Sequence, residues 1–466
     1  MEQLFGTGFS SKSPNVTAQR RVNCYYEFIP DSDKTSVAIY GTPGIDLFAD
    51  FGDTPIRGMW SPTWDSYFYL VHRGTFWQVD NAGVKTSRGT INTTTGRVSI
   101  SDNGTQIIIV DGTDGWIYNT STFAFTQITD VDFPANPNTV SFDSGRFLVD
   151  DNNTGRIYGS LAYNGLSWEG LEFFTAESIP DQVIRVESVK GYIVPFGEFS
   201  IEFWQNAGLP GFPYTRVGGA NQDFGLAARW SVVNYLGTLA FLAKTKNGEV
   251  NVSILSGYTV ERISDFELEN TINGFASVAD AVFYSYMLRG HPMLVIIFPS
   301  AGYSFLYDAS TKVWSDLKSK DLNRHRGDIH VNFKNKSYLS DFSNGKLYRI
   351  NPDTYTDNGE EIRMELISRH LYKEGRLIRI SSFQVDGQMG VGLVSGQGSN
   401  PQMMLSVSKD GGHSFSNERW VTIGAIGNYT TRARWRQIGS ARDFVFKIVI
   451  TDPVKRVITR VYLDER

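Results

Sequence analysis

A chain of 466 residues exceeds one ordinary hydrophobic core, so we expect either two domains or one large domain built from repeats. With 44 Lys and Arg against 49 Asp and Glu, the net charge of −5 excludes the strongly basic footprint of a general nucleic-acid binder. The single cysteine, Cys24, excludes an intrachain disulfide framework. The 14% of aromatic residues and the 45 glycines favour many short strands joined by tight turns.

Residues 1–53 are predicted to form an irregular, partly extended arm. This stretch contains no apolar segment of signal-peptide length, and the apolar run 293–298 is too short to span a bilayer. We therefore expect a chain that is made in the cytoplasm and stays soluble.

Seven stretches of the chain share one pattern, in which an apolar strand enters a short Gly, Asn or Asp turn and a second strand follows. They are residues 67–80, 106–119, 145–159, 191–205, 239–254, 293–308 and 337–350. Their marker residues, spaced 40 to 53 residues apart, are Trp77, Tyr118, Tyr158, Trp204, Ile254, Tyr307 and Tyr348. A strand-rich unit that recurs about every 40 residues is typical of a β-propeller blade.

Residues 54–354 are therefore predicted to form a β-propeller in which each hairpin is the middle of a blade. We expect about seven blades, with six as the alternative, because the fifth hairpin ends in Ile254 where the others have an aromatic residue. A strand from one terminus usually closes such a ring, and we expect residues 37–40 to supply it. Residues 160–182 are predicted to form a surface excursion, and residues 224–234 and 277–285 are the helix candidates.

The pattern changes near Tyr355, and the charge changes with it. Residues 355–466 carry 16 Lys and Arg against 12 Asp and Glu, which leaves 28 against 37 for residues 1–354. Phe444, Phe446, Ile448 and Ile450 alternate as a half-buried strand requires. We therefore predict an all-β protein, with a separate C-terminal β-sandwich over residues 355–466.

Residues 408–415 match the Asp-box pattern S-x-D-x-G-x-S/T-W/F. Asp410 would accept backbone N–H bonds across a hairpin turn, Gly412 would adopt dihedrals closed to other residues, and Phe415 would fill the core. The same motif occurs in sialidases, where it is also structural. We therefore interpret it as a stabilised turn and not as a catalytic site.

Arg432, Arg434 and Arg436 alternate along a predicted strand, so their guanidinium groups share one face. Two interpretations stay open: a solvated face, or a docking surface for an acidic partner or DNA phosphate. The six histidines show no metal-ligand spacing, and no serine or cysteine triad is marked by its sequence context. The sequence therefore predicts no cofactor, no metal and no catalytic residue.

The chain resembles the packaged-DNA stabilisation proteins, also called tail hub or tail accessory factors, of short-tailed phages. The resemblance covers nearly the whole chain, through RVNCYYE, GTPGIDLF, PIRGMW, TGRVSISDNGTQIIIVDG, GLSWEGLEFFTAESIPD, FGEFSIEFWQNAG, YTVERIS, DNGEEIR, DGGHSFSNERW and ARDFVFKIVITDPV. It implies a virion structural protein, not an enzyme. Such a protein forms a hexameric ring below the portal and its adaptor after packaging, helps to retain the DNA, and carries the tail needle and tailspikes.

Two other functions stay open: a propeller enzyme that hydrolyses glycans, and a glycan- or receptor-binding tail protein. A hydrolase would need a pair of carboxylates facing into the disc, or an arginine cluster for a sugar acid. For the hub, we expect the DNA channel to be lined by the acidic region 1–354, because an acidic wall repels phosphate. The basic C-terminal domain would then face protein partners.

Overall fold

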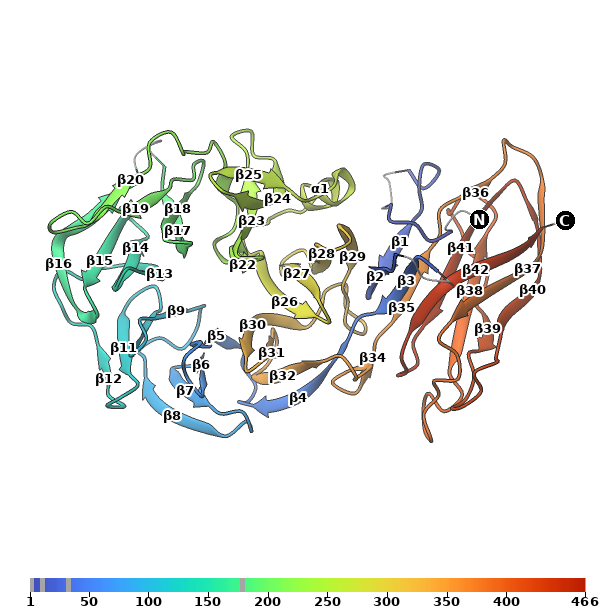
Figure 1. Ribbon diagram of the computed structural model, residues 1–466, viewed down its shortest axis with the longest axis horizontal. Coiled ribbons are helices and arrows are strands. Elements are labelled where there is room, and N and C mark those ends of the chain that lie inside the picture. Colours follow the sequence, from blue (N-terminus) through green and yellow to red (C-terminus); the bar gives the residue numbers. More distant parts are fainter. Residues whose placement is uncertain (1–3, 9–12, 31–34, 177–180, 466) are drawn as a thin grey trace.

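The computed structural model describes residues 4–8, 13–30, 35–176 and 181–465. It is nearly all β, with a disc of β-sheets beside a two-sheet sandwich (Figure 1). Helical structure in the described part of the chain is limited to α1 (Phe266–Ile272) and a single 3-10 turn, η1 (Arg229–Ser231). The fold is thus a β-propeller followed by a β-sandwich, as the sequence predicts.

Seven antiparallel sheets follow one another around the disc, and each is a blade of four main strands. The first three blades are β5 (Ile56–Trp60), β6 (Phe68–His72), β7 (Thr75–Val79) and β8 (Lys85–Thr90); β9 (Ser99–Asp102), β10 (Gln106–Val110), β11 (Gly115–Asn119) and β12 (Phe125–Gln127); and β13 (Pro137–Asp143), β14 (Arg146–Asp151), β15 (Arg156–Leu161) and β16 (Asn164–Thr175). The fourth is β17 (Val183–Val189), β18 (Tyr192–Gly197), β19 (Trp204–Asn206) and β20 (Tyr214–Arg216).

The last three blades complete the disc. In the fifth, the short strands β21 (Gly225–Leu226) and β22 (Val233–Tyr235) both pair with β23 (Thr238–Lys244), and β24 (Val250–Ser256) and β25 (Thr259–Arg262) follow. The sixth and seventh are β26 (Val282–Leu288), β27 (His291–Phe298), β28 (Tyr303–Asp308) and β29 (Val313–Asp316); and β30 (Gly327–Phe333), β31 (Lys336–Asp341), β32 (Lys346–Asn351) and β4 (Gly44–Asp50).

All seven predicted hairpins are the second and third strands of successive blades, including the fifth, which lacks the aromatic marker. The second strand of a blade, such as β6, β10 or β27, is almost continuously buried, because the neighbouring blades cover both of its faces. Two-residue turns with positive φ link many strands, as at Lys190–Gly191 (φ 52° and 78°). Such turns match the right-handed twist of the strands that they join.

An N-terminal strand does close the ring, but residues 37–40 do not supply it. The closing strand is β4, which pairs with β32 in register Tyr348↔Leu47. The predicted strand lies in β3 (Val37–Gly41), which belongs to the sandwich. Both strands are extended and apolar and lie on either side of Pro43, so their sequence pattern does not distinguish the two sheets.

The sandwich consists of two sheets. One runs β1 (Arg20–Val22), β35 (Met364–Ile367), β41 (Asp443–Ile450), β38 (Gln402–Ser408) and β39 (Arg419–Thr422), with β36 (Leu371–Tyr372) also paired to β41. The other runs β2 (Cys24–Phe28), β3, β42 (Val457–Glu465), β37 (Ile378–Gly387) and β40 (Ala433–Ala441). The short strands β33 (Thr356–Asp357) and β34 (Glu360–Glu361) extend the seventh blade beside β4.

The sandwich core is shared by the two ends of the chain. Phe444, Phe446, Ile448 and Ile450 face it, as their alternation predicts. The N-terminal members of the same core are Leu4, Phe5, Cys24, Tyr26, Val37 and Ile39. The predicted N-terminal arm is therefore divided, with β1 to β3 in the sandwich and β4 in the propeller.

Strand β1 joins the two domains directly. It pairs in parallel with β29 of the sixth blade through Val22↔Asp316, and it pairs antiparallel with β35 of the sandwich. Arg20 adds an ion pair of 2.7 Å to Asp316. The Asn23 side chain donates to the backbone carbonyls of Lys318 (3.0 Å) and Arg363 (2.9 Å). These bonds hold the propeller and the sandwich to one another.

Two local predictions are wrong. The described part of residues 160–182 does not leave the blade, because β15 and β16 form a long, bulged hairpin; residues 177–180 lie outside the described residues. Of the helix candidates, residues 224–234 contain the single 3-10 turn η1 between the short strands β21 and β22, and residues 277–285 run into strand β26. The α-helix begins after Asp265, whose carboxylate accepts from the Leu268 amide at 2.9 Å as an N-cap.

Asp150 in the third blade makes stability depend on pH. Its carboxylate accepts from the Thr139 amide (2.8 Å) and the Asn138 side chain (2.7 Å), yet burial raises its pKa to about 6 from an ordinary 3.8. The folded chain therefore holds this proton more tightly than the unfolded chain, so its stabilising effect is complete below about pH 4 and is lost as the pH rises through 6.

From pH 4 to 7, we expect the stability of the wild type to fall relative to that of Asp150→Asn by up to about 3 kcal/mol. Calorimetric melts at matched ionic strength measure the difference, with the exposed Asp132→Asn as control. Parallel pH profiles for the wild type and Asp150→Asn would contradict it.

Candidate functional site

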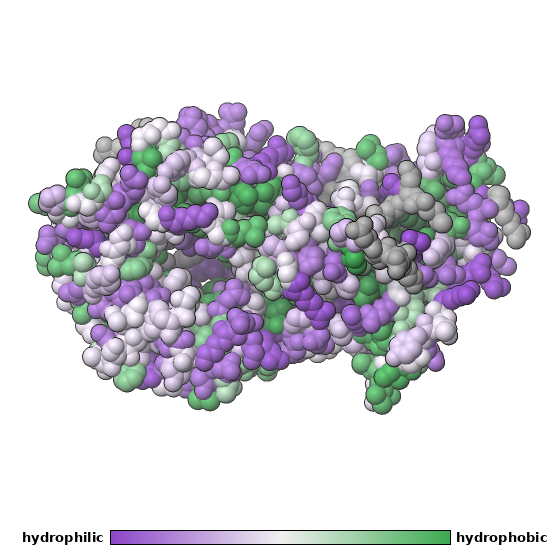
Figure 2. Space-filling view, in the orientation of Figure 1, coloured by the Kyte–Doolittle hydropathy of each residue, from purple (hydrophilic) through white to green (hydrophobic). Residues whose placement is uncertain are grey.

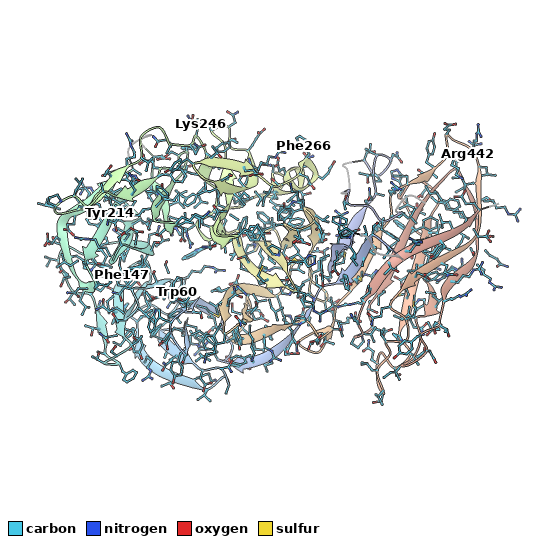
Figure 3. The ribbon with its side chains drawn as sticks, in the orientation of Figure 1. Trp60, Phe147, Tyr214, Lys246, Phe266 and Arg442 are labelled. Atoms are coloured by element: carbon cyan, nitrogen blue, oxygen red, sulfur yellow. The ribbon has the colours of Figure 1, made fainter. Side chains whose placement is uncertain are left out.

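A cavity of about 910 Å³ lies at the centre of the disc. We call it the axial cavity, because the innermost strands of the blades line it, from β5 and β9 round to β26 and β30. Figure 2 shows the opening in the middle of the disc, and Figure 3 places Trp60 beside it. Its volume falls in the range of small-molecule sites.

Two tryptophans stand at one mouth of the axial cavity. Trp60 ends β5, and Trp64 lies in the following loop with 44% of its surface exposed. Both indole N–H groups donate to the carboxylate of Asp102, at 2.8 and 2.7 Å. One carboxylate thus fixes both rings, so the mouth carries a preformed aromatic surface.

The charged groups of the axial cavity are paired. Arg97 forms an ion pair of 2.7 Å with Asp328, and Arg185 forms one with Glu187. The two guanidinium groups lie 5.8 and 5.4 Å from the ring centre of Trp230, within the range of cation–π attraction. The axial cavity thus contains carboxylates and arginines, the residue types that a glycan hydrolase would need. Both arginines, however, are engaged by these carboxylates.

Arg57, the third arginine of the lining, is buried, and its hydrogen bonds go to the surrounding backbone. Its guanidinium donates to the carbonyls of Gly96, Arg73, Thr93 and Thr95 at 2.6 to 2.8 Å. Burial lowers the pKa of Arg57. This side chain ties the loops around the first and second blades together, so we assign it a structural role.

The Asp-box residues form a compact turn after β38. The Ser408 and Ser414 hydroxyls both donate to Asp410, whose carboxylate also accepts from the Ser414 amide at 3.0 Å. These hydrogen bonds, led by the one from Ser408, hold the pKa of Asp410 well below its usual range. Gly412 has a φ of +88°, which disfavours other residues.

Phe415 does not fill the core as expected. It is half-buried, and the Lys447 ammonium lies 4.8 Å from its ring centre. Lys447 lies between the core residues Phe446 and Ile448, so its side chain points away from the core, and the Phe415 ring packs against it on that outward face. The hydrogen bonds around Asp410 are those of a stabilised turn.

Two of the three arginines lie on β40 at the edge of the sandwich, and the third directly precedes it. Arg434 and Arg436 alternate with the buried Ala433 and Trp435, and Arg432 precedes the strand on the same exposed side. Arg434 donates to the Ser382 hydroxyl at 2.9 Å. We call these three residues the arginine stripe; their exposure suits either a solvated face or a docking surface.

Two kinds of feature are absent from the described part of the chain. Residues 4–8, 13–30, 35–176 and 181–465 contain no group of three or more His, Cys, Asp or Glu side chains arranged to hold a metal ion. Across the same residues, no helix is long and apolar enough to cross a membrane.

Sequence reasoning did not identify the residues that line the axial cavity, since they come from strands spread over about 270 residues. The available signal was local: Trp60 ends one blade strand, Trp64 follows four residues later, and Asp102 ends the equivalent strand of the next blade. Residues at equivalent blade positions are neighbours around the axis, and this rule could have brought them together.

Comparison with known proteins covers both domains. A family model for the β-propeller of bacteriophage P22 Gp10 matches residues 6–355, and a second, for the β-sandwich of the same protein, matches residues 363–465. The chain belongs to the bacteriophage P22 Gp10 family. A curated relative in this family, the tail hub protein gp10 of Salmonella phage P22, is 22% identical over 296 residues. That match covers 60% of this chain and 60% of the relative.

Solved structures show more distant likenesses. The extracellular domain of a putative hybrid two-component system from B. thetaiotaomicron aligns with a TM-score of 0.47 and 8% identity, covering 73% of this chain and 43% of that one. The WD40 β-propeller domain of Doa1 aligns with a TM-score of 0.40 and 13% identity, covering 66% and 96%. Neither likeness bears on the function of this Gp10 family member.

Proposed function

We propose that this chain is a tail hub, a structural protein of the virion of a short-tailed phage. It forms a ring, hexameric by our expectation, that docks below the portal and adaptor once DNA is packaged. There it retains the DNA, carries the tail needle and tailspikes, and forms part of the ejection conduit. The observation that carries this proposal is the match of both domains, in order, to those of P22 Gp10.

The junction between the domains supports a role as a building block. Because β1 is hydrogen-bonded into the sixth blade and into the sandwich, the two domains present a fixed outer surface. Rings form when subunits meet head to tail through a rotation that closes. A ring that withstands the pressure of packaged DNA needs large contacts, on the order of 2,000 Å² or more.

Two surfaces of the sandwich suit such contacts. The first is the apolar tip, formed where the loops 388–401 and 423–431 pack together. It exposes Leu393, Val394, Ile426 and Tyr429 to between 40 and 86%, and Figure 2 shows apolar residues at this end of the sandwich. The second is the arginine stripe. Exposed apolar groups beside a basic surface are typical of protein docking sites.

The two ends of the disc differ in charge. The loops that connect each second strand to the third, and each blade to the next, carry Asp111, Asp114, Asp132, Asp223 and Glu249. The turns at the other end carry Lys190, Arg289, Lys312 and Lys334 against Asp65 and Asp80. We propose that the acidic end faces the DNA channel, since an acidic wall avoids the counterion release that makes basic surfaces adhere to DNA.

Reversal of charge in the arginine stripe tests its docking role. We expect Arg434→Glu to weaken binding to the portal–adaptor complex or to the tailspike by at least tenfold, because a complementary contact becomes repulsive. Arg442→Glu, an exposed arginine in the β40–β41 turn, is the matched control (Figure 3). Surface plasmon resonance measures both. If Arg434→Glu binds as tightly as the wild type and melts at the same temperature, the arginine stripe is a solvated face.

The hub role itself is tested in infection. Phage that lack this chain are expected to fill their heads with DNA and then lose it, and to lack attached tailspikes. Added purified chain should restore DNA retention and infectivity in extracts. We also expect the chain to be found in the tail of complete virions. Stable, infectious particles without the chain would overturn the proposal.

The alternative of a glycan hydrolase has its own test. If turnover of host surface polysaccharide were abolished by substitution of a single carboxylate of the axial cavity, the chain would be an enzyme. We expect no turnover, because Asp102 is engaged by two indole N–H groups and both Glu187 and Asp328 are paired to arginines.

A further inference from the structure

We propose that the axial cavity is a binding site for a neutral saccharide, with Trp60 and Trp64 as its stacking surface. This goes beyond the hub role and does not depend on it, since it concerns the centre of one subunit. Three features of the axial cavity carry the inference: a preformed aromatic mouth, a lining whose charges are paired, and many short polar side chains.

The aromatic mouth is held ready for a ligand. Trp64 remains 44% exposed although a large aromatic group gains from burial, and the hydrogen bonds to Asp102 fix both indoles. Their polar edges are occupied, so a ligand meets the ring faces. An aromatic face is electron-rich and attracts the weakly positive C–H groups that one side of a sugar ring presents.

The pairing of charges decides between ligand classes. Nucleic acid or another polyanion would require free cations, but Arg97 and Arg185 are engaged by carboxylates and Arg57 by backbone carbonyls. A basic peptide would require a free carboxylate, and Asp102, Glu187 and Asp328 all have partners. A neutral ligand does not have to break any of these pairs, and breaking a partly buried pair is costly.

The rest of the axial cavity is lined by short polar side chains that can form hydrogen bonds. Hydroxyl and amide residues line the axial cavity from all seven blades, with Thr63, Ser101, Ser141, Ser188, Asn234, Ser285 and Asn332 as one example from each. Such groups both donate and accept, as sugar hydroxyls do. With a volume of about 910 Å³, the cavity has room for a short oligosaccharide.

The experiment uses the full purified chain on an array of defined neutral and acidic bacterial oligosaccharides. Any neutral glycan that binds is then titrated against the intrinsic tryptophan fluorescence. We expect at least one neutral glycan to bind, and Trp64→Ala to weaken it tenfold or more. Trp64→Phe should lose less affinity than Trp64→Ala, because it keeps a stacking face although it loses the hydrogen bond to Asp102.

The control is Trp420→Ala, which removes a tryptophan 60% exposed on the sandwich and should leave the affinity unchanged. Thermal melts confirm that each variant is folded. The inference is overturned if no neutral glycan binds, if Trp64→Ala binds as well as the wild type, or if only acidic glycans, DNA or basic peptides bind. None of these outcomes alters ring assembly, so the hub role is judged separately.

Discussion

Residues 355–466, expressed without the rest of the chain, are expected to remain unfolded. They contain all of the C-terminal sandwich that the sequence predicts, yet β1, β2 and β3 lie outside them. Without these strands, one sheet loses β1 and the other loses two of its five strands. The sandwich would then expose a core face and leave one edge of β35 and one edge of β42 without a partner strand.

The free energy contributed by the buried N-terminal side chains supports this expectation. Cys24, Tyr26, Val37 and Ile39 are all at most 7% exposed in the shared core. Burial of such side chains contributes about 1.5–3 kcal/mol each. Their sum is of the same order as the whole stability of a typical domain, about 5–15 kcal/mol. Loss of the N-terminal strands should therefore abolish cooperative folding and not merely lower the melting temperature.

The measurement is the dispersion of amide signals in a ¹⁵N NMR spectrum, together with a thermal melt. A circular permutant supplies the control, with residues 4–41 attached through a flexible linker after residue 465. We expect dispersed signals from the permutant alone. A dispersed spectrum and a cooperative melt for residues 355–466 by themselves would contradict the shared core.

Substitution of Arg456 by methionine is expected to lower the free energy of unfolding by about 3 kcal/mol. Arg456 is only 2% exposed and is the largest fully buried side chain in the described part of the chain. Its guanidinium donates to the Ile362 carbonyl (2.7 Å) and the Thr42 carbonyl (3.1 Å). It thereby ties the β3–β4 connection to the segment between the propeller and the sandwich.

Two effects compete at this site. Burial lowers the pKa of Arg456 to about 10, so the charge is costly to hold, although the group stays protonated at neutral pH. Removal of the guanidinium relieves that cost but leaves two buried carbonyls without their donor, at about 1–3 kcal/mol each. We expect the second effect to prevail, because methionine also leaves part of the volume empty.

Urea titrations of the wild type, Arg456→Met and Arg456→Lys measure the balance. Lysine has a single ammonium nitrogen and cannot place separate N–H donors at both carbonyls as the guanidinium does. We therefore expect it to rescue only part of the stability. Lys455→Met, at the half-buried neighbouring position, should change little. A midpoint for Arg456→Met at or above that of the wild type would show that relief of the buried charge prevails.

The hairpins could be predicted from the sequence because each is a local object. The strand, turn and second strand of residues 106–119 carry their own alternation and their own turn chemistry, and β10 and β11 pair within that stretch. Closure of the ring is different, because it pairs β4 with β32 about 300 residues away. Nothing local distinguishes β4 from β3, so the choice of partner sheet could not be read from their patterns.

The candidate sites divide in the same way. The Asp-box turn is built within eight residues, so the bonds around Asp410 follow from the motif. The burial of Phe415 depends on which face of the sandwich the turn leaves, and that expectation was wrong. The axial cavity is assembled from strands of different blades, so its ligand class depends on ion pairs such as Arg97–Asp328 that only the fold creates.

The most direct test of the central claim is electron microscopy of the purified chain mixed with the portal and adaptor of its phage. We predict six-fold rings docked below the portal, with the acidic ends of the propellers toward the channel. A chain that stays monomeric beside portal rings, or that assembles with a basic channel wall, would contradict the account.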